Sequence, residues 1–515
     1  LTKVLQTHRQ IFFCIRKAHS DPSFNPNFPP RPLMHPPRRH HAPRSHRPFL
    51  LGLLVFVAGL FPAAAQGITI QTPADASYLE TLAAQELRRL IYQRTGERLA
   101  IAASDILPAQ GDLILVADQS DLFVGTLESH SSGEGGFFLK TVAHSDRKVL
   151  VVSGKGGEET LAAAYRYAEK PVSEGGLGIS FGLAEEVVPS VRLESFSVPT
   201  GLDEAAEPLF ATRGLNPWHD FPSGPDLWGT QDYLALISQL PKVGMNFIGL
   251  HTYPRYNEYY HYENQTFDRG PEPTVWIGLP GDYDANGQVS WSYPAYYAHS
   301  QRPNLIWGLA EYNTGQYHGG TRELFPTDGW GSEVIGETPP APGDLDASNA
   351  VFNRAGNLFN TAFTHAQRIG VKTALGTELP LGQAVTDDGE TWVRAMPQEL
   401  QDRLAEQGKT PSDPAVVKDV YKGIFDRIKK THPLDYFWLW SWEVWPGKTT
   451  ASREAMEADI ALAREALAEL GNPFTLGFAG WKLGAANNEP GNDADDEPTV
   501  FNDDFALSSP FFSLL

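Results

Sequence analysis

The sequence of 515 residues contains a single cysteine, Cys14. One thiol cannot build a disulfide framework, so an apolar core must hold the fold together, and the 41% hydrophobic share is sufficient for one. Cys14 also lies in an N-terminal segment that we expect to be absent from the mature protein. Nucleophilic catalysis by cysteine is therefore excluded.

Positive charge is scarce as well. The chain has 41 Lys and Arg against 62 Asp and Glu, a formal net charge of −21. This balance repels phosphate backbones and anionic membrane surfaces, so we expect no nucleic-acid partner and no membrane docking. Aromatic residues are plentiful, with 12 Trp, 18 Tyr and 28 Phe, which excludes a disordered or fibrous chain.

The N-terminal apolar run, residues 49–61, is too short to cross a bilayer, which takes about 20 residues. It follows the first methionine, Met34, and four arginines, and it precedes three alanines. This order predicts a signal peptide over residues 34–65, with 1–33 as upstream translation; a retained N-terminal anchor is the alternative. Beyond residue 65 the chain has no cysteine, so we expect a secreted or periplasmic bacterial protein.

Tryptophan divides the remaining chain in two. All 12 tryptophans lie between Trp218 and Trp481. We therefore predict a small α/β domain over residues 66–200 and a second domain over 205–515. In the first, an amphipathic helix over 79–91 stops at Gly96, and the apolar runs 113–116 and 149–152 are typical of strands buried on both faces.

The second domain repeats a unit of strand, loop and helix. Strands are expected at residues 209–215, 246–250, 371–375, 436–440 and 474–479, and helices at 230–243, 349–369, from Pro414 onward and around 456–470. This alternation predicts parallel pairing and a TIM (β/α)8 barrel. A sixth strand around 305–309 and a seventh from 505 leave the barrel incomplete, because closure takes eight. We expect a truncated or frame-shifted C-terminus; a six-stranded variant is the alternative.

Two carboxylates stand at expected strand exits, Glu378 and Glu443. In a (β/α)8 barrel the C-terminal strand ends carry the active site. Glycosidic cleavage needs two carboxylates, of which one protonates the leaving oxygen and the other attacks or activates water. We predict Glu378 as the general acid and Glu443 as the nucleophile or base. The alternative is that Glu443 is a solvated loop residue beside tryptophans that pack between barrel and helices.

Aromatic and polar residues near the same exits are the candidates for substrate binding. Flat aromatic rings stack on sugar rings, and Arg255 with His251 would hold a uronate or sulfate group. The alternative for each is a hydrogen-bonded residue that orders the barrel rim. The predicted binding residues are Trp218, His219, Asp220, His251, Tyr253, Arg255, Glu311, Trp440 and Trp442.

Residues Asp282-Tyr283-Asp284-Ala285-Asn286-Gly287 match the first half of a calcium loop. Position 12 of that loop is Tyr293 instead of the bidentate Glu. Asn286-Gly287 is also a strong hairpin signal, so we predict a hairpin turn, with a calcium site as the alternative. The histidines beyond residue 65 show no zinc-binding pair, and we expect no metal and no cofactor.

Segments of the first domain resemble a known domain: residues 83–90, Thr95-Gly96, 135–138, 160–165 and Val188-Pro189. They are similar to the N-terminal α/β domain of bacterial α-glucuronidases and β-N-acetylhexosaminidases, which precedes a catalytic (β/α)8 barrel. The resemblance covers about residues 67–200 and implies a carbohydrate-active protein without choosing the sugar. The adjacent Asp-Glu pair of the hexosaminidases is absent at Gly376-Thr377-Glu378, which argues against substrate-assisted cleavage.

Together these patterns predict a secreted glycoside hydrolase that acts on an acidic poly- or oligosaccharide. Its partner is a carbohydrate substrate, with no nucleic acid and, after signal cleavage, no membrane. A non-catalytic glycan-binding protein on the same fold is the alternative. A polysaccharide lyase that uses Tyr253 with His251 and Arg255 is a further one. The sugar, the stereochemistry and the oligomeric state stay open.

Overall fold

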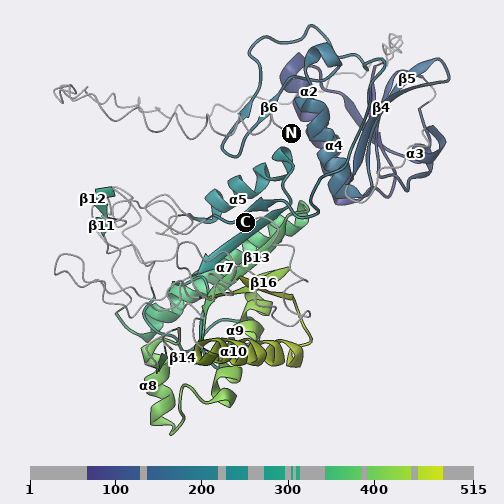
Figure 1. Cartoon of the computed structure of the whole chain (residues 1–515). Helices are drawn as coiled ribbons and strands as arrows, with labels where there is room; N and C mark the ends of the chain where they lie inside the picture. The colour runs from purple at the N-terminus through teal and green to yellow at the C-terminus, as the bar shows by residue number, and fades with distance from the viewer. Residues whose placement is uncertain are drawn as a thin grey trace, which may run out of the picture. The chain divides into compact units, whose positions relative to one another are not determined.

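The structure is a computed structural model (Figure 1). It describes residues 67–108, 110–127, 136–217, 228–252, 272–295, 303–304, 309–313, 343–385, 391–393, 395–441 and 450–479. All of these belong to one compact unit, Ala63–Leu515. Among them, no helix combines the length and the apolar character that a membrane crossing needs. The segments expected as upstream translation and signal peptide lie outside the described residues, so both stay predictions.

The first sheet has six strands in the order β2-β1-β3-β5-β4-β8. Neighbours from β2 to β5 pair in parallel, and β4 pairs antiparallel with both β5 and β8. The bounds are β1 Thr69–Thr72, β2 Ala100–Ala103, β3 Leu113–Val116, β4 Phe137–His144, β5 Arg147–Gly154 and β8 Asp203–Ala206. A separate two-stranded hairpin holds β6 Ser180–Phe181 and β7 Glu186–Val187.

Helices cover both faces of this sheet. Helices α2 (Tyr78–Thr95) and α4 (Gly157–Glu169) share one apolar cluster with Ile114 and Val152, and the short α3 (Leu122–Leu127) packs on the other face. Strand β3 is therefore buried throughout, as its apolar run predicts. Helix α2 also ends as predicted, because Gly96 takes the left-handed conformation, with φ of +83°, that caps a helix at low cost. The short 3₁₀ helix η1 (Val172–Glu174) follows α4.

The second sheet has five strands in the order β17-β16-β13-β10-β9, all parallel. Each strand lies beside the next one along the chain in this sheet. The bounds are β9 Gly214–Leu215, β10 Phe247–Thr252, β13 Lys372–Leu379, β16 Tyr436–Ser441 and β17 Thr475–Ala479. The connecting elements are α5 Thr230–Gln239, the 3₁₀ helix η3 Pro241–Val243, α7 Leu345–Arg368, α9 Pro414–Thr431 and α10 Thr450–Glu469.

The two faces of this sheet differ. Apolar residues of α5, α7, α9 and α10 form one core with alternate strand residues such as Leu250, Leu375 and Leu439. The opposite face, which we call the inner face, carries a separate small cluster of Phe247, Ala374 and Trp438. In the described part of the chain the helices of this sheet pack on one face, whereas a doubly wound sheet has helices on both. Five strands of the sheet are described, and closure into a barrel stays a prediction.

Two expected barrel strands are shorter in the structure or lie mostly outside the described residues. Of the run expected at 305–309, residues 305–308 are not described, and the strands on either side, β11 (Pro303–Asn304) and β12 (Leu309–Asn313), pair antiparallel in a sheet of their own. The strand expected at 209–215 is only Gly214–Leu215, and the one expected from residue 505 lies outside the described residues.

Additional elements follow β13. The hairpin of β14 (Gln383–Val385) and β15 (Thr391–Val393) leads to α8 (Gln398–Glu406). Helix α9 then begins where its sequence predicts, because Asp413 caps it by accepting from the amide of Ala415 at 2.8 Å, with Pro414 in the first turn.

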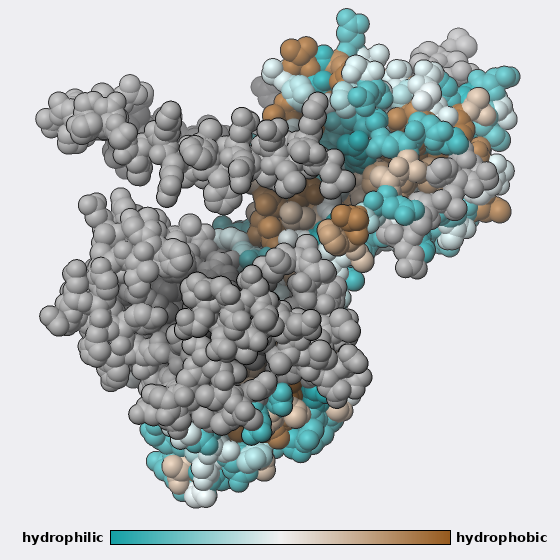
Figure 2. Space-filling view, viewed as in Figure 1, coloured by the Kyte–Doolittle hydropathy of each residue, from teal (hydrophilic) through white to brown (hydrophobic). Residues whose placement is uncertain are grey.

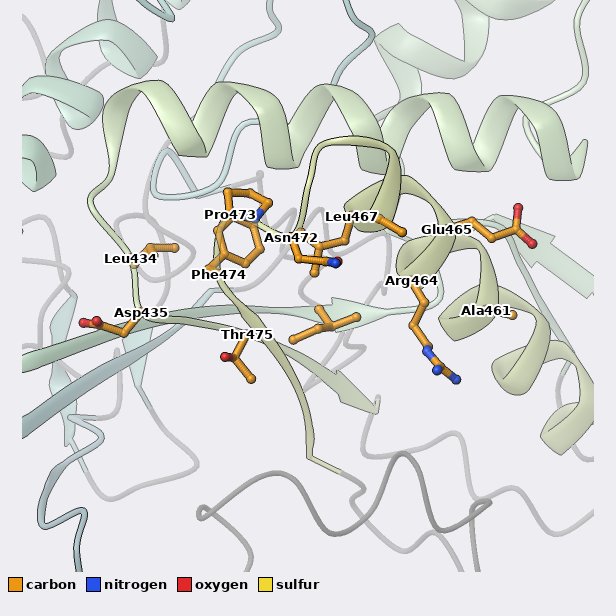
Figure 3. Close-up of a pocket in the computed structure, with 12 residues that line it drawn as sticks. Leu434, Asp435, Ala461, Arg464, Glu465, Leu467, Asn472, Pro473, Phe474 and Thr475 are labelled. Atoms are coloured by element: carbon orange, nitrogen blue, oxygen red, sulfur yellow. The ribbon is translucent and has the colours of Figure 1, made fainter.

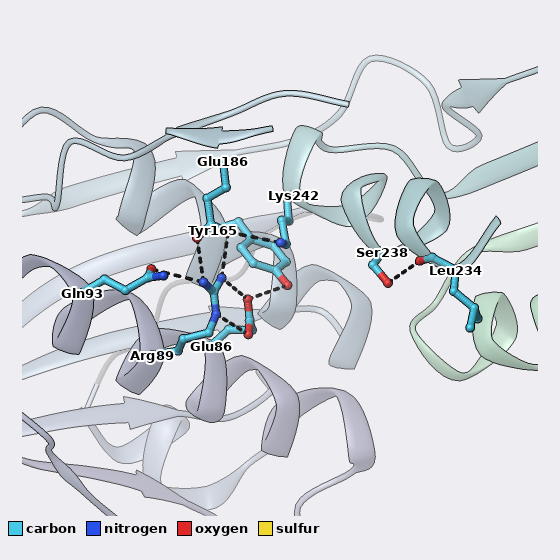
Figure 4. A network of polar contacts seen from close by, with 8 residues as sticks. All are labelled: Glu86, Arg89, Gln93, Tyr165, Glu186, Leu234, Ser238 and Lys242. Carbon is cyan, nitrogen blue, oxygen red and sulfur yellow. Dashed lines mark hydrogen bonds and ion pairs between the residues drawn. The ribbon is translucent and has the colours of Figure 1, made fainter. Parts of the chain in front are cut away.

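An ion-pair network connects α2 with the segment that precedes β10 (Figure 4). Arg89 donates to Glu86 (Nη2–Oε2, 2.7 Å) and to Glu186 (Nη1–Oε1, 2.6 Å). The Lys242 ammonium donates to Glu186 at 3.1 Å, and the Tyr165 hydroxyl donates to Glu86 at 3.3 Å. Burial raises the pKa of Glu186, but the hydrogen bonds and charges of Arg89 and Lys242 outweigh it and lower that pKa.

Hydrophobic side chains on the surface are dispersed. Figure 2 shows brown residues interspersed with hydrophilic ones over the part that holds the first sheet. The most exposed large apolar residues are Ile106, Leu122, Val191 and Leu209. Single exposed apolar side chains are normal on folded proteins, so these four indicate no interface.

Candidate functional site

The candidate site lies where β10, β13 and β16 end. Because the three strands are parallel, their carboxyl ends meet at one edge of the sheet. In the ladder, His251 lies beside Gly376, which lies beside Trp438. Glu378 is one inner-face position further along β13, beside position 440. Strand alternation therefore places Glu378 and His251 on the inner face, with Trp438 in the row that His251 occupies.

Trp438 forms an aromatic floor beneath this edge. A Cβ built on Gly376 would lie 1.3 Å from Trp438 Cδ1, and one built on Gly249 would lie 2.3 Å from Trp438 Cη2. The indole thus extends from β16 across β13 to β10, over two residues that have no side chain. Its ring lies 6.3 Å from that of Phe247, centroid to centroid, and only 5% of the residue is exposed.

Two predicted residues, Glu378 and His251, are brought together by the structure. They are 1% and 3% exposed, on adjacent strands and on the same face by alternation. An ionisable pair at a strand exit above an aromatic floor is an arrangement that can protonate or orient a bound polar group.

The other predicted site residues divide into two groups. Trp440 lies in β16, where the ladder pairs it with Glu378. Glu311 lies in β12, one strand of the antiparallel pair, and its role in binding stays a prediction. The remaining residues lie outside the described part of the chain: Trp218, His219, Asp220, Tyr253, Arg255, Trp442 and Glu443. Their roles stay predictions.

The segment after β13 is held by a residue that the sequence interpretation missed, Asp459 of α10. Its carboxylate accepts hydrogen bonds from the amides of Leu381 and Gly382, the third and fourth residues after Glu378. The signal in the sequence was an acidic residue on the apolar stripe of a helix, between Met456 and Ile460. A charge at such a position is uncommon in a core unless it has partners.

The hairpin predicted at 282–287 is confirmed. Tyr283 and Val289 form an antiparallel bridge, and Gly287 has a φ of +78°. The Asp282 carboxylate pairs with both terminal nitrogens of Arg403 at 2.8 Å, and Asp284 Oδ1 accepts from amides of its own turn. Both carboxylates therefore have structural partners, which argues against the calcium alternative.

One pentapeptide, Gly178-Ile179-Ser180-Phe181-Gly182, matches the nucleophile elbow of serine hydrolases. That motif requires a strand, a sharp turn and a helix. Ser180 instead lies exposed in β6, whose chain turns back into the antiparallel strand β7. The match is therefore no catalytic serine site.

A cavity of about 960 Å³ lies at the other edge of the second sheet (Figure 3). It is lined by Asp435 and Thr475, where β16 and β17 begin, and by Arg464 and Glu465 of α10. Since Glu378 stands where β13 ends, this cavity is separate from the candidate site. Within the described residues, no group of three or more His, Cys, Asp and Glu is placed to hold a metal.

No protein-family model matches the sequence, and no curated protein sequence matches it. Solved structures of carbohydrate-active enzymes are similar to the chain at low identity. A GH138 enzyme targeting pectin rhamnogalacturonan II matches at 10% identity and a TM-score of 0.39, over 79% of this chain and 34% of its own. A GH20 β-N-acetylhexosaminidase from Streptomyces coelicolor matches at 10% and 0.37, over 82% and 63%. A Streptomyces plicatus β-hexosaminidase variant with its product GlcNAc matches at 12% and 0.38, over 81% and 62%.

The chain therefore spans between about a third and two thirds of the length of these glycoside hydrolase structures. The structure confirms the predicted fold class in part: it is a mixed α/β architecture with parallel strands.

Proposed function

We propose that the chain is a secreted glycoside hydrolase and that its second sheet is an arc of a (β/α)8 barrel. The support for the barrel is the strand order, in which each strand lies beside its successor in the sheet, together with the packing of the described helices α5, α7, α9 and α10 on one face. In this proposal residues 34–65 are the signal peptide, 66–200 the α/β domain and 205–515 the barrel domain.

The observation that carries the activity is the position of Glu378. Its carboxyl group stands at the C-terminal end of the central strand β13, on the face where Trp438 forms an aromatic floor. A carboxylic acid at a strand end suits glycosidic cleavage, because it can protonate the departing oxygen while aromatic residues at the neighbouring strand ends stack on the sugar. Glu378 is the general acid in this mechanism.

The second carboxylate is assigned to Glu443, two positions beyond the end of β16. As nucleophile it would attack the anomeric carbon; as base it would activate a water. A separation of about 5–5.5 Å between the carboxyl groups would give retention, and about 6.5–9.5 Å would give inversion.

The substrate class that we propose is an acidic poly- or oligosaccharide. His251 is on the inner face beside Gly376, one row below Glu378. Arg255, four residues further along the chain, is assigned to hold a uronate or sulfate group together with His251. The aromatic residues Trp218, Tyr253, Trp440 and Trp442 would stack on the sugar rings, and His219 with Asp220 would bind hydroxyl groups.

The test is product release. The full-length chain is incubated with a panel of uronate-bearing and sulfated polysaccharides, and released sugars are identified by mass spectrometry. Glu378→Gln keeps the size of the side chain but removes the proton donor, and Glu406→Gln, on the exposed end of α8, is the matched control. We expect release by the wild type and the control, and release slower by about 10²–10⁴-fold by Glu378→Gln.

Other outcomes identify the alternatives. Glycan binding that Glu378→Gln leaves intact, with no release by any variant, would indicate a non-catalytic glycan-binding protein. A product that carries an unsaturated, ultraviolet-absorbing sugar would indicate a lyase.

A further inference from the structure

A buried carboxylate holds the segment through which the chain leaves Glu378. Asp459 Oδ1 accepts a hydrogen bond from the amide of Gly382 at 2.9 Å, and its Oδ2 accepts from the amide of Leu381 at 3.2 Å. The Tyr421 hydroxyl of α9 donates to Oδ2 as well. The segment after β13 and the helices α9 and α10, which are far apart in the sequence, therefore meet at one side chain.

The surroundings of Asp459 are apolar. The residue is 4% exposed and lies on the core side of α10, and its three hydrogen-bond partners are neutral groups. Burial raises the pKa of Asp459, and the hydrogen bonds from Tyr421, Gly382 and Leu381 oppose that rise. A carboxyl group in such surroundings is destabilising unless its hydrogen bonds are made, so helix packing alone would favour an apolar residue here.

The fit around Gly382 is close. A Cβ at this position would lie 3.0 Å from Val417 Cγ2 and 3.2 Å from Asp459 Oδ1. The backbone of Gly382 is therefore packed between α9 and the carboxylate, and the hydrogen bond from its amide is made at short range. Little room is left for the segment to shift without breaking a contact.

We propose that Asp459 is a positioning residue for Glu378. This inference rests on the proposed function, because it assigns Glu378 to the reacting edge. The amides that Asp459 holds belong to the third and fourth residues after Glu378, and Leu379 and Leu381 in this segment are fully buried. Fixing this segment from the side of α10 fixes the end of β13. A general acid must be held within about 0.5 Å of the position from which it can protonate its target oxygen.

We call the hydrogen bonds from the amides of Leu381 and Gly382 to Asp459 the clamp, and the first test measures whether they hold this segment. Asp459→Asn is of equal size, but an amide offers one acceptor oxygen, so in either orientation its NH₂ group faces one of the two backbone donors. Hydrogen–deuterium exchange of peptides spanning residues 379–385 is expected to accelerate by about tenfold in the full-length variant. Asp419→Asn, on the exposed face of α9, is the control and should leave this exchange unchanged.

If Asp459→Asn fails to fold, a second variant tests the same hydrogen bonds. Tyr421→Phe removes one hydroxyl donor and keeps both amide hydrogen bonds. We expect a smaller acceleration of exchange in the same peptides. Unchanged exchange in every folded variant of Asp459 and Tyr421 would overturn the clamp.

The second test separates positioning from general loss of structure. The probes are methyl and 2,4-dinitrophenyl glucuronides, each as the α and the β anomer. A misplaced acid slows cleavage of the methyl glycoside, whose leaving group needs a proton, and spares the dinitrophenyl glycoside, whose leaving group does not. For Asp459→Asn we expect kcat on the methyl glycoside to fall by about tenfold or more, with kcat on the dinitrophenyl glycoside within about twofold and KM unchanged.

The outcomes distinguish the two claims. An equal fall of kcat on both glycosides would show a merely structural role and overturn the proposal. If the wild type cleaves none of the four glucuronides, the proposed action on uronates and the role of Asp459 in positioning the acid are both contradicted. The exchange experiment would still decide whether Asp459 holds residues 381 and 382.

Discussion

The indole of Trp438 lies over Gly376, so close that a Cβ on Gly376 would come within 1.3 Å of Trp438 Cδ1. The two residues pair in the ladder between β13 and β16, one row below Glu378. A large flat ring on one strand thus depends on the absence of a side chain on the next. This relationship forms the floor of the candidate site.

Gly376→Ala should therefore destabilise the protein. The methyl group would displace the indole, and overpacking of this kind costs about 1–3 kcal/mol in the free energy of unfolding. Urea denaturation of the variant measures it. Gly125→Ala, where nothing lies within 4 Å of the added Cβ, is the control; because Gly125 is inside α3, this variant should not be destabilised and should gain up to about 1 kcal/mol in that free energy.

The same contact predicts coupling between two substitutions. Trp438→Phe makes the ring smaller, so part of the cost of Gly376→Ala should disappear in the double variant. We expect a coupling free energy of about 0.5–3 kcal/mol from the double-mutant cycle. Strict additivity would mean that the two side chains do not compete for this space.

Acid should destabilise the fold through His432. Its ring stacks on Phe359 at 5.2 Å, Nδ1 lies 2.7 Å from Thr431 Oγ1, and the residue is 1% exposed. Burial, aided by the charge of Arg427, lowers the pKa of His432 from 6.5 to about 3. Between these values the unfolded state binds a proton that the folded state does not, so stability falls as the pH falls below about 6.5.

The contribution of His432 to this slope is at most about 1.4 kcal/mol per pH unit. Urea titrations at pH 7, 6 and 5 measure the slope, and His432→Gln should make it shallower. His144→Gln, at a partly exposed strand end, should leave the slope as in the wild type. An unaltered slope in His432→Gln would show that this ring is not the acid-sensitive group.

Glu186 should cause a second loss of folding stability in acid, at a lower pH than His432. Its pKa is lowered from 4.5, since the hydrogen bonds and charges of Arg89 and Lys242 outweigh burial. The stabilisation is therefore complete above about pH 4.5 and is lost as the pH falls through the lowered pKa. In Glu186→Gln the loss of thermal stability between pH 5 and pH 3 should be smaller than in the wild type. Glu194→Gln, which is exposed, provides the comparison.

The sequence predicted local elements well, where one or two residues decide the outcome. Asp413-Pro414 marks the start of α9, Gly96 ends α2, and Asn286-Gly287 makes a hairpin turn. The position of Glu378 at a strand end was also predictable, because the apolar run before it reads as a buried strand.

Long-range relationships were not predictable from the sequence. Residues 303–313 have the residue types of a strand, but pairing decides whether a strand joins the parallel sheet, and pairing depends on the connection that precedes it. The role of Asp459 follows from partners 38 and about 78 positions away. Nor does the sequence show that Gly249 and Gly376 lie beneath a tryptophan from a third strand.

The most direct test of the account is the rate at which full-length wild type and Glu378→Gln release sugar from the uronate-bearing and sulfated glycans. General acid catalysis contributes about 10²–10⁴-fold, so the variant should lose turnover by a factor in this range while still binding glycan. Release at the same rate by wild type and Glu378→Gln would contradict the assignment of Glu378 as the acid.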